Sequence, residues 1–426
     1  MVEMYSTFAP DAGKTPEQLL AERTKRLQDA VDLKQPDRVP VMLAMSYMLA
    51  DIGGITRQEL HANPEKAQEL LEKAALEYQP ETIFGVYNDW GASLALGDRM
   101  TKWPGHGLEP NGSFQFDEHE FMKAEDYDDF LEDPADWGIR VYMPRAFSEL
   151  SGLSMLPPLG MTLFGHYNLP NMGVIAAPPM MAAVQALGRA VQAAAELGAR
   201  NVASLKRMAA LGFPPGPLVG SLVEAPFDFM SDTLRGMRGI MLDIHQRPEK
   251  LLAAEATVAR FQTKFALDFA RATGLKNAFF PLHRGSDGFM SLSQFETFYW
   301  PQLKGMLVEF VENGITPLVF YEGVWDKRLE YLTELPRAKT LGMFQDSDIF
   351  KVKEVVGDTM CVFGGMPNWL LQAGTVEAVR ERTKKVCEVV GKGGGFVMST
   401  SVGEMEGSRP KLVKAWIAAT REYGTY

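Results

Sequence analysis

The chain has 426 residues and a formal net charge of -11, with 46% hydrophobic and 23% charged residues. This is the composition of a globular protein, and the length allows either one large domain with insertions or two domains. The acidic balance, without any cluster of Lys and Arg, excludes a nucleic-acid surface, and no apolar run reaches membrane-spanning length.

The two cysteines, Cys361 and Cys387, both lie in apolar stretches. Because no CxxC pair is present, we expect neither a thiolate metal site nor a disulfide framework. The first residues are acidic and have no apolar core, which argues against a signal peptide. The sequence therefore predicts a cytoplasmic protein with no membrane partner.

A helical extension over about residues 1–36 opens the chain. Thr15 is the expected N-cap of its helix, and Pro16 is the expected first helical residue. Short apolar runs then predict strands over residues 37–45 and 81–90.

The second of these strands ends on Asp89 and Trp90, a carboxylate and an aromatic ring. Residues 103–143 are hard to assign, because a hairpin-like alternation is followed by a run dense in carboxylates. A long irregular insertion in a compact domain usually covers something, so a lid or an oligomer contact is expected there.

The second half of the chain alternates regularly between apolar runs and amphipathic helical stretches. Each run is too short for a buried helix, and polar residues follow it. The expected strands are residues 217–224, 277–283, 316–323, 339–345, 361–366 and 394–399.

Parallel strands joined by helices form either an open doubly wound sheet or a closed (β/α)8 barrel, the TIM barrel. One continuous barrel domain over residues 1–426, with the extension and a lid-like insertion, is the simpler account. In both architectures the chemistry gathers at the carboxyl ends of the strands.

The strand ends supply the candidate site residues. A histidine side chain titrates near neutral pH, so His283 can act as a general acid, a general base or a metal ligand. Glu322 can act as a base, orient a substrate or bind a hard metal ion. Asp346 is the candidate that follows the next strand, while Asp348 is the expected N-cap of the helix after it. The candidates for substrate binding are Arg284, Tyr321, Trp325, Glu224, Asp89 and Trp90.

Each candidate also has a structural interpretation. His283 can simply bond to a neighbouring loop, and Glu322 can pair with Arg284 to hold two loops together. The aromatic residues can belong to the core. His283 and Glu322 could also bind zinc or another divalent ion. This prediction depends only on their positions at strand ends, because the sequence lacks a local ligand motif such as His-Glu-x-x-His.

Four stretches between Pro217 and Tyr426 resemble the uroporphyrinogen decarboxylase superfamily, which includes corrinoid-dependent methyltransferases. They are Gly-Ser-Asp-Gly-Phe-Met-Ser-Leu-Ser-Gln-Phe from Gly285, Asn-Gly-Ile-Thr-Pro-Leu-Val-Phe from Asn313, Phe-Gly-Gly-Met-Pro from Phe363 with Leu-Leu-Gln-Ala-Gly-Thr after it, and Gly-Gly-Gly-Phe-Val-Met-Ser from Gly393. The resemblance implies a (β/α)8 barrel, and homodimers occur among such barrels.

The chain departs from this superfamily at two functional motifs. The His, Cys and Cys that bind zinc in its thiol-activating methyltransferases fall on Phe320, Glu322 and Val402, and phenylalanine and valine cannot bind zinc. The Arg-Gln-Ala-Gly-Arg motif with which the porphyrinogen decarboxylases grip their substrate is absent. Neither methyl transfer to a thiol nor decarboxylation of a tetrapyrrole is therefore expected.

Three hypotheses follow. The first is a methyltransferase that moves a methyl group from a small methoxylated or methylated substrate to a corrinoid (cobalamin-type) protein. This chain lacks the Asp-x-His-x-x-Gly corrinoid signature, so the corrinoid would come with a partner protein.

The second hypothesis is a decarboxylase or other lyase that needs no cofactor, in which Arg284 would bind a carboxylate and His283 or Asp346 would deliver the proton. The third, a barrel without chemistry, is disfavoured by the polar strand ends.

Overall fold

The structure is a computed structural model that describes residues 11–85, 89–160, 173–402 and 404–426. The chain forms two units. Unit 1 consists of Met1–Tyr87, Ala203–Ala225 and Arg260–Tyr426, and unit 2 consists of Asn88–Val202 and Pro226–Ala259. The single domain over residues 1–426 stays a prediction, as does the covering role of residues 103–143, which fall in unit 2.

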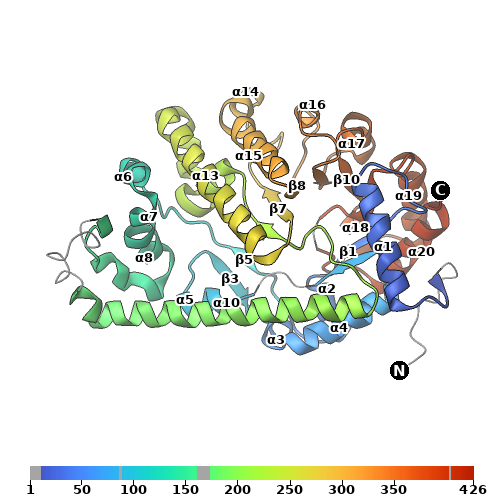
Figure 1. Ribbon diagram of the computed structural model, residues 1–426, viewed down its shortest axis with the longest axis horizontal. Coiled ribbons are helices and arrows are strands. Elements are labelled where there is room, and N and C mark those ends of the chain that lie inside the picture. Colours follow the sequence, from blue (N-terminus) through green and yellow to red (C-terminus); the bar gives the residue numbers. More distant parts are fainter. Residues whose placement is uncertain (1–10, 86–88, 161–172, 403) are drawn as a thin grey trace. The chain divides into compact units, whose positions relative to one another are not determined.

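The described part of unit 1 contains eight parallel strands that alternate with helices (Figure 1). In chain order they are β1 (Met42–Ala44), β2 (Thr82–Phe84), β6 (Ser221–Leu222), β7 (Asn277–Leu282), β8 (Thr316–Tyr321), β9 (Leu341–Phe344), β10 (Cys361–Met366) and β11 (Phe396–Thr400).

The strands neighbour one another in the order in which they occur in the chain. Strands β6 to β11 form one six-stranded sheet, and β1 and β2 form a second. A parallel bridge from Val41 to Met398 places β1 next to β11. This α/β arrangement confirms the predicted fold class, and its strand order is that of a (β/α)8 barrel. Between β2 and the segment before β6, Thr82 Oγ1 donates a 2.9 Å hydrogen bond to the Pro214 carbonyl.

Alternate residues of these strands form one apolar cluster. Strand β8 contributes Leu318 and Phe320, β9 contributes Leu341 and Met343, and β10 contributes Cys361 and Phe363. Because side chains alternate between the two faces of a strand, these residues define the inward face of the sheet. The alternation explains why short, continuously apolar runs form these strands: their intervening residues are buried as well, on the other face.

Helix α1 (Pro16–Val31) adds Leu27 and Ala30 to this cluster, beside residues that begin strands. It therefore covers the amino ends of the strands, which leaves the carboxyl ends for chemistry. Thr15 is its N-cap, as predicted, and forms a capping box with Gln18.

A buried ion cluster ties α1 to the beginnings of β1 and β2. Arg38 bonds Asp11 at 3.0 Å and Glu81 at 3.0 Å, and Arg26 bonds Glu81 at 3.2 Å and Asp37 at 2.6 Å. Glu81 also accepts a 2.7 Å hydrogen bond from the main-chain N–H of Val41. Mutual pairing explains how the charges of Asp11, Arg26, Arg38 and Glu81 can be buried, whereas Asp37 lies at the exposed edge of the cluster.

The other helices of unit 1 follow the strands or lie between them. They are α2 (Met48–Gly53), α3 (Arg57–Ala62), α4 (Pro64–Tyr78), α14 (Leu292–Gln294), η7 (Phe295–Tyr299), α15 (Trp300–Glu312), α16 (Leu329–Leu332), α17 (Ile349–Val356), α18 (Asn368–Ala373), α19 (Val376–Val389) and α20 (Pro410–Tyr423).

Unit 2 is mostly helical, and two helices run from one unit into the other: α10 (Pro178–Ala210) and α13 (Pro248–Thr273). Its other elements are α5 (Gly91–Leu96), β3 (Thr101–Pro104), β4 (Gly107–Leu108), β5 (Gln115–Phe116), η2 (Ala124–Asp126), α6 (Tyr127–Glu132), α7 (Pro134–Trp137), η3 (Gly138–Tyr142), α8 (Met143–Ala146), η4 (Ser148–Met155), α11 (Pro226–Phe229), η6 (Met230–Arg235) and α12 (Gly236–Gln246). No helix in the described ranges has a stretch long and apolar enough to cross a bilayer.

Three predicted elements differ from the structure. Strand β2 ends at Phe84, well before Trp90, and β6 has only two residues. A Cβ at Gly220 would lie 1.9 Å from the Asn277 carbonyl oxygen, so the chain beside β6 approaches β7 too closely for any other residue. The helix expected over residues 291–313 contains the π-helical turn η7, which ends two residues before Pro301. Proline has no N–H to continue an α-helical ladder.

Candidate functional site

The register of the sheet brings His283 and Glu322 together. Leu282 lies opposite Tyr321 in the β7–β8 ladder, so the next residue of each strand is also paired. His283 Nε2 is 3.5 Å from Glu322 Oε1, and the two side chains are 30% and 36% exposed. The pair is therefore accessible to a substrate and has a group able to carry a proton.

Both residues continue the inward face of their strands. The corresponding positions of β9, β10 and β11 are Gln345, Gly365 and Ser399. The pairing of β8 with β9, of β9 with β10 and of β10 with β11 places these residues level with Glu322. We call His283, Glu322, Gln345, Gly365 and Ser399 the inward layer. Gln345 Oε1 accepts a 2.9 Å hydrogen bond from Gly323 N–H, which fixes the turn after Glu322.

The surface next to the pair is apolar. Leu222 is aligned with Phe279 in the β6–β7 ladder, so it shares the inward face, and 60% of its surface is exposed. Phe279 and Pro281, on the same face of β7, are half-buried. By the same alternation Glu224 also belongs to the inward face, and its main chain is held by two hydrogen bonds of 2.8 and 3.0 Å with the Gln262 amide.

The loops that carry His283 and Glu322 are locked together by a second pair, which the sequence did not reveal. The buried guanidinium of Arg328 bonds the Asp287 carboxylate and donates a 2.7 Å hydrogen bond to the Met290 carbonyl. The Asp287 N–H donates to the Val324 carbonyl at 2.7 Å. Asp287 and Arg328 therefore hold these two loops together.

Tyr321 and Trp325 are fully buried and support the site from behind. Tyr321 stacks on Phe344 with ring centroids 4.5 Å apart, and burial raises the pKa of its phenol. Trp325 Nε1 donates a 2.8 Å hydrogen bond to the Glu322 carbonyl. The geometry gives both residues a supporting role, whereas their contact with substrate stays a prediction.

Gly285, directly beyond Arg284, is required by this packing. A Cβ there would lie 2.4 Å from Trp325 Cη2 and 2.6 Å from Tyr299 Cε1. The Arg284 guanidinium lies over the Phe289 ring, 5.3 Å from its centroid. Arg284 is therefore held within the loop that follows His283.

The remaining candidates are Asp346, which follows Gln345 in unit 1, and Asp89 and Trp90. Asp346 is exposed, and its main-chain N–H donates a 3.2 Å hydrogen bond to Gly323, while Asp348 is the N-cap of α17, as predicted. Asp89 and Trp90 belong to unit 2. Asp89 accepts hydrogen bonds from Gly91 N–H at 2.7 Å and from Arg200 at 2.6 Å, so it ties α5 to α10.

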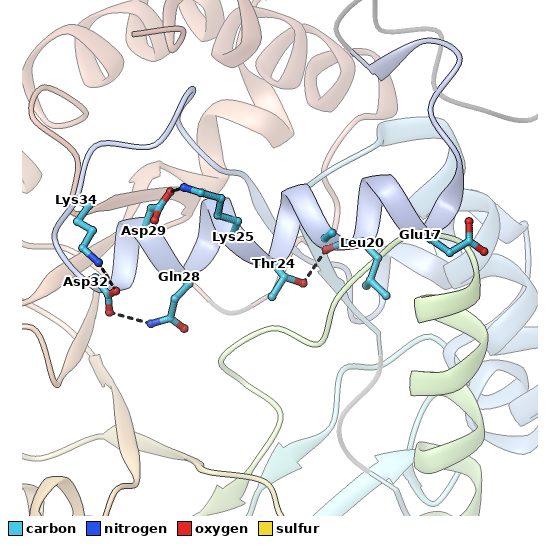
Figure 2. A pocket seen from close by; sticks show the side chains of 9 residues that line it. Glu17, Leu20, Thr24, Lys25, Gln28, Asp29, Asp32 and Lys34 are labelled. Atoms are coloured by element: carbon cyan, nitrogen blue, oxygen red, sulfur yellow. Dashed lines mark hydrogen bonds and ion pairs between the residues drawn. The ribbon is translucent and has the colours of Figure 1, made fainter.

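A surface hollow of about 700 Å³ lies on the outer face of α1 (Figure 2). Its charged side chains already bond one another, as Lys34 does with Asp32 at 3.0 Å. Since α1 covers the amino ends of the strands, this hollow is not the candidate site.

Within the described part of the chain, no group of three or more His, Cys, Asp and Glu side chains is arranged to hold a metal ion. His283 and Glu322 supply one nitrogen and one carboxylate donor, whereas a catalytic zinc site normally has three protein ligands. The donors of the described residues therefore do not fit a resident zinc ion.

The family described as uroporphyrinogen decarboxylase (URO-D) matches residues 170–423, more than half of the chain. The chain belongs to the uroporphyrinogen decarboxylase family. This confirms the resemblance seen in the sequence, and it covers the strand ends that carry the inward layer.

Two solved structures show how far the likeness extends. A methyltransferase from Methanosarcina mazei is 17% identical, with a TM-score of 0.59 over 94% of this chain and 98% of that chain. It shares the fold. A Listeria monocytogenes protein assigned as a vitamin-B12 independent methionine synthase is 15% identical over 48% of this chain and 64% of that chain, and its TM-score of 0.33 is too low to indicate a shared fold. No curated protein matches the sequence significantly.

Proposed function

We propose that this member of the uroporphyrinogen decarboxylase family is an enzyme that moves a methyl group from a small methoxylated or methylated substrate to a separate corrinoid protein. The observation that carries the proposal is the accessible pair of His283 and Glu322, 3.5 Å apart at the carboxyl ends of β7 and β8. In a parallel α/β fold this is where catalytic residues gather.

The inward face favours a substrate without several carboxylates. None of its strand positions, from Met42 to Ser399, holds a Lys or Arg, whereas Glu224 and Glu322 both belong to it. A polycarboxylate would be repelled by these two side chains and would find no cationic partner on the strands. The exposed Leu222 and the half-buried Phe279 suit the apolar body of a methylated small molecule.

His283 is the proposed proton donor. When the bond from the methyl carbon to oxygen or nitrogen breaks, the heteroatom keeps the electron pair and needs a proton. Protonated His283 supplies it, and the carboxylate of Glu322, 3.5 Å from Nε2, stabilises the imidazolium and orients the ring. A bound corrinoid would supply the cobalt that accepts the methyl group.

The corrinoid is proposed to arrive with its own protein, because this chain lacks the Asp-x-His-x-x-Gly signature. A divalent ion such as zinc at His283 and Glu322 would need further ligands from water or substrate. The proposed proton transfer therefore uses only the chain's own groups.

Arg284 carries the second candidate function, a decarboxylase or lyase that acts on a small carboxylated substrate without a cofactor. It directly follows His283 and is held over Phe289. Its guanidinium would bind the substrate carboxylate, and His283 would protonate the carbanion that remains after carbon dioxide leaves.

The test is a methyl-transfer assay with the purified full-length chain, a reduced corrinoid protein and a panel of methoxylated and methylated small molecules. We expect methylcobalt absorbance to appear and a His283→Gln variant to form it about 100-fold more slowly. A parallel assay measures carbon dioxide released from small carboxylic acids. Carbon dioxide release without any methylcobalt would overturn the methyltransferase proposal in favour of the lyase.

A further inference from the structure

The side-chain amide of Gln345 has its oxygen fixed and its nitrogen unused. The main-chain N–H of Gly323 can only donate a hydrogen bond, and it donates one to Gln345 Oε1 at 2.9 Å. The amide oxygen must therefore face Gly323, and Nε2 points the other way. Among the described residues Nε2 has no acceptor, and it is not one of the polar atoms sealed from solvent. The amide therefore presents a donor in a fixed orientation to any molecule bound beside it.

Gln345 lies level with the proposed catalytic pair. It follows Phe344, which is aligned with Tyr321 in the β8–β9 ladder, and its own N–H donates a 3.1 Å hydrogen bond to the Tyr321 carbonyl. Neighbouring strands lie about 4.8 Å apart, so the row of His283, Glu322 and Gln345 covers roughly 10 Å of the sheet. A small molecule that places one end at His283 can therefore reach Gln345 with its other end.

The strand beyond Gln345 leaves room for that other end. Strand β10 pairs with β9 only as far as Phe363 and Met343, whereas Gly364 and Gly365 pair with β11 alone. Both glycines have positive φ, of +135° and +100°. A Cβ added at either would approach the helices outside the sheet, at 3.6 Å from a side chain of α17 or 2.8 Å from one of α19. Neither position could project a side chain inward, so main chain alone lines the space next to Gln345.

We propose that Gln345 binds the substrate, by a hydrogen bond from Nε2 to a second oxygen that lies away from the methylated heteroatom. This inference rests on the proposed methyl transfer and narrows its substrate class to compounds with two acceptor atoms, one at His283 and one at Gln345. The second oxygen is uncharged, because the carboxylates of Glu224 and Glu322 belong to the same inward face and would repel a third.

Two variants separate substrate binding from the bond to Gly323. Gln345→Glu keeps the length of the side chain and an oxygen for the Gly323 N–H, but replaces the NH2 donor with a second acceptor. Gln345→Met keeps the length and removes both groups. If Gln345 only fixed the turn after Glu322, Gln345→Glu would behave like the wild type. Binding of a substrate oxygen predicts instead that both variants are impaired.

Steady-state methyl transfer from three matched methyl ethers is the first measurement. Para-methoxyacetophenone has an acceptor carbonyl across the ring, para-ethyl methoxybenzene lacks it, and para-methoxybenzylammonium has a donor in its place. Relative to the wild type, we expect Gln345→Glu to lower kcat/KM for the ketone about tenfold, through KM, because one hydrogen bond is lost. The ethyl compound should be little affected, and the ammonium compound should gain. Gln302→Glu, at a half-buried glutamine on α15, is the matched control and should leave all three values unchanged.

Calorimetric binding of the same compounds to the enzyme alone separates this inference from the proposed function. Methylcobalt formation with the same preference in wild type and Gln345→Glu overturns the role of Gln345 and leaves the methyl transfer intact. Binding that depends on Gln345, without methylcobalt from any compound, overturns the methyl transfer and keeps Gln345 as a ligand-binding residue. Equal behaviour of the two proteins in both assays, absence of binding included, overturns the role of Gln345.

Discussion

Trp325 Nε1 donates a 2.8 Å hydrogen bond to the main-chain carbonyl of Glu322. The indole is fully buried and packs against Tyr321 at a centroid distance of 4.9 Å. One buried side chain therefore fixes both the turn that carries the Glu322 carboxylate and the strand end before it. The position of the proposed catalytic pair depends on this packing as well as on the sheet register.

Replacing Trp325 with phenylalanine keeps an aromatic ring but removes the N–H. We expect the free energy of unfolding to fall by about 1–2 kcal/mol, because a buried carbonyl loses its donor. Turnover should fall about tenfold, because Glu322 would be less well positioned. Urea unfolding and steady-state kinetics measure the two effects.

Trp300→Phe is the control for the Trp325 variant. Trp300 Nε1 makes only a 3.5 Å contact with Glu334, so its removal should leave turnover unchanged. If the two variants lose the same activity, the hydrogen bond to Glu322 has no special role.

His283 and Glu322 should act as one unit in the chemical step. We expect His283→Ala and Glu322→Ala each to lower kcat by about 100-fold, and the double variant to be little worse than either single variant. Single-turnover kinetics of the wild type, the two single variants and the double variant complete a double-mutant cycle. Independent, multiplying losses would show that the pair does not work together.

The ion cluster at the amino ends of β1 and β2 should be important for stability. Glu81 is nearly fully buried and bonds both Arg26 and Arg38. We expect Glu81→Gln to lower the free energy of unfolding by about 3–5 kcal/mol, because two buried guanidinium groups lose their shared carboxylate.

A matched change at an exposed pair provides the comparison. Glu65 is 81% exposed and lies 3.0 Å from Arg207, so Glu65→Gln should cost less than about 0.5 kcal/mol. Both variants are compared by urea unfolding at pH 7. Equal losses would contradict a special role for the buried cluster.

Asp11 should make the fold sensitive to acid. Burial tends to raise its pKa, but the hydrogen bonds and charge of Arg38 outweigh this, and the pKa lies below the ordinary value of 3.8. The stabilisation is therefore present above the unfolded pKa and is lost as the pH falls through the lowered folded pKa. Asp11→Asn should be less stable at pH 7 and should depend less on pH below about 4. Urea midpoints between pH 7 and pH 3 test this, and parallel curves for the two proteins would contradict it.

Glu255 in unit 2 should make the fold less stable as the pH rises, which is the opposite of the effect of Asp11. Burial, followed by the charge of Asp228, raises the pKa of Glu255 well above 4.5, and neither of its carboxyl oxygens has a hydrogen-bond partner among the described residues. Its contribution is most favourable below the unfolded pKa and is lost as the pH rises through the folded pKa. Glu255→Gln should therefore raise the melting temperature at pH 8 and change it little at pH 4. A lower melting temperature at both pH values would show that the carboxylate has a partner in solution.

The strands of the second half could be predicted from local sequence because apolar runs and turn residues determine them locally. The predicted strand over residues 361–366 coincides with β10, and Asp348 caps α17 as expected. His283 and Glu322 could be chosen because each directly follows such a run. Their approach to 3.5 Å, by contrast, depends on the register between β7 and β8, which no local pattern encodes.

Contacts between residues far apart in the chain could not be predicted from the sequence for the same reason. Asp287 and Arg328 are 41 residues apart, and nothing around either one specifies the other. The full burial of Tyr321 could not be predicted either, because it depends on packing against Phe344, a residue of the next strand. The division into two units depends on contacts between distant segments.

The bridge between Val41 and Met398 has a consequence for biosynthesis. Strand β1 leaves the ribosome long before its neighbour β11, which lies far along the chain. Until then the edges of β1 and β10 lack the partners that cover them, and contacts of such large sequence separation form slowly. The nascent chain therefore carries exposed strand edges until β11 is made, so its yield in the cell should depend on chaperones that shield those edges in the meantime.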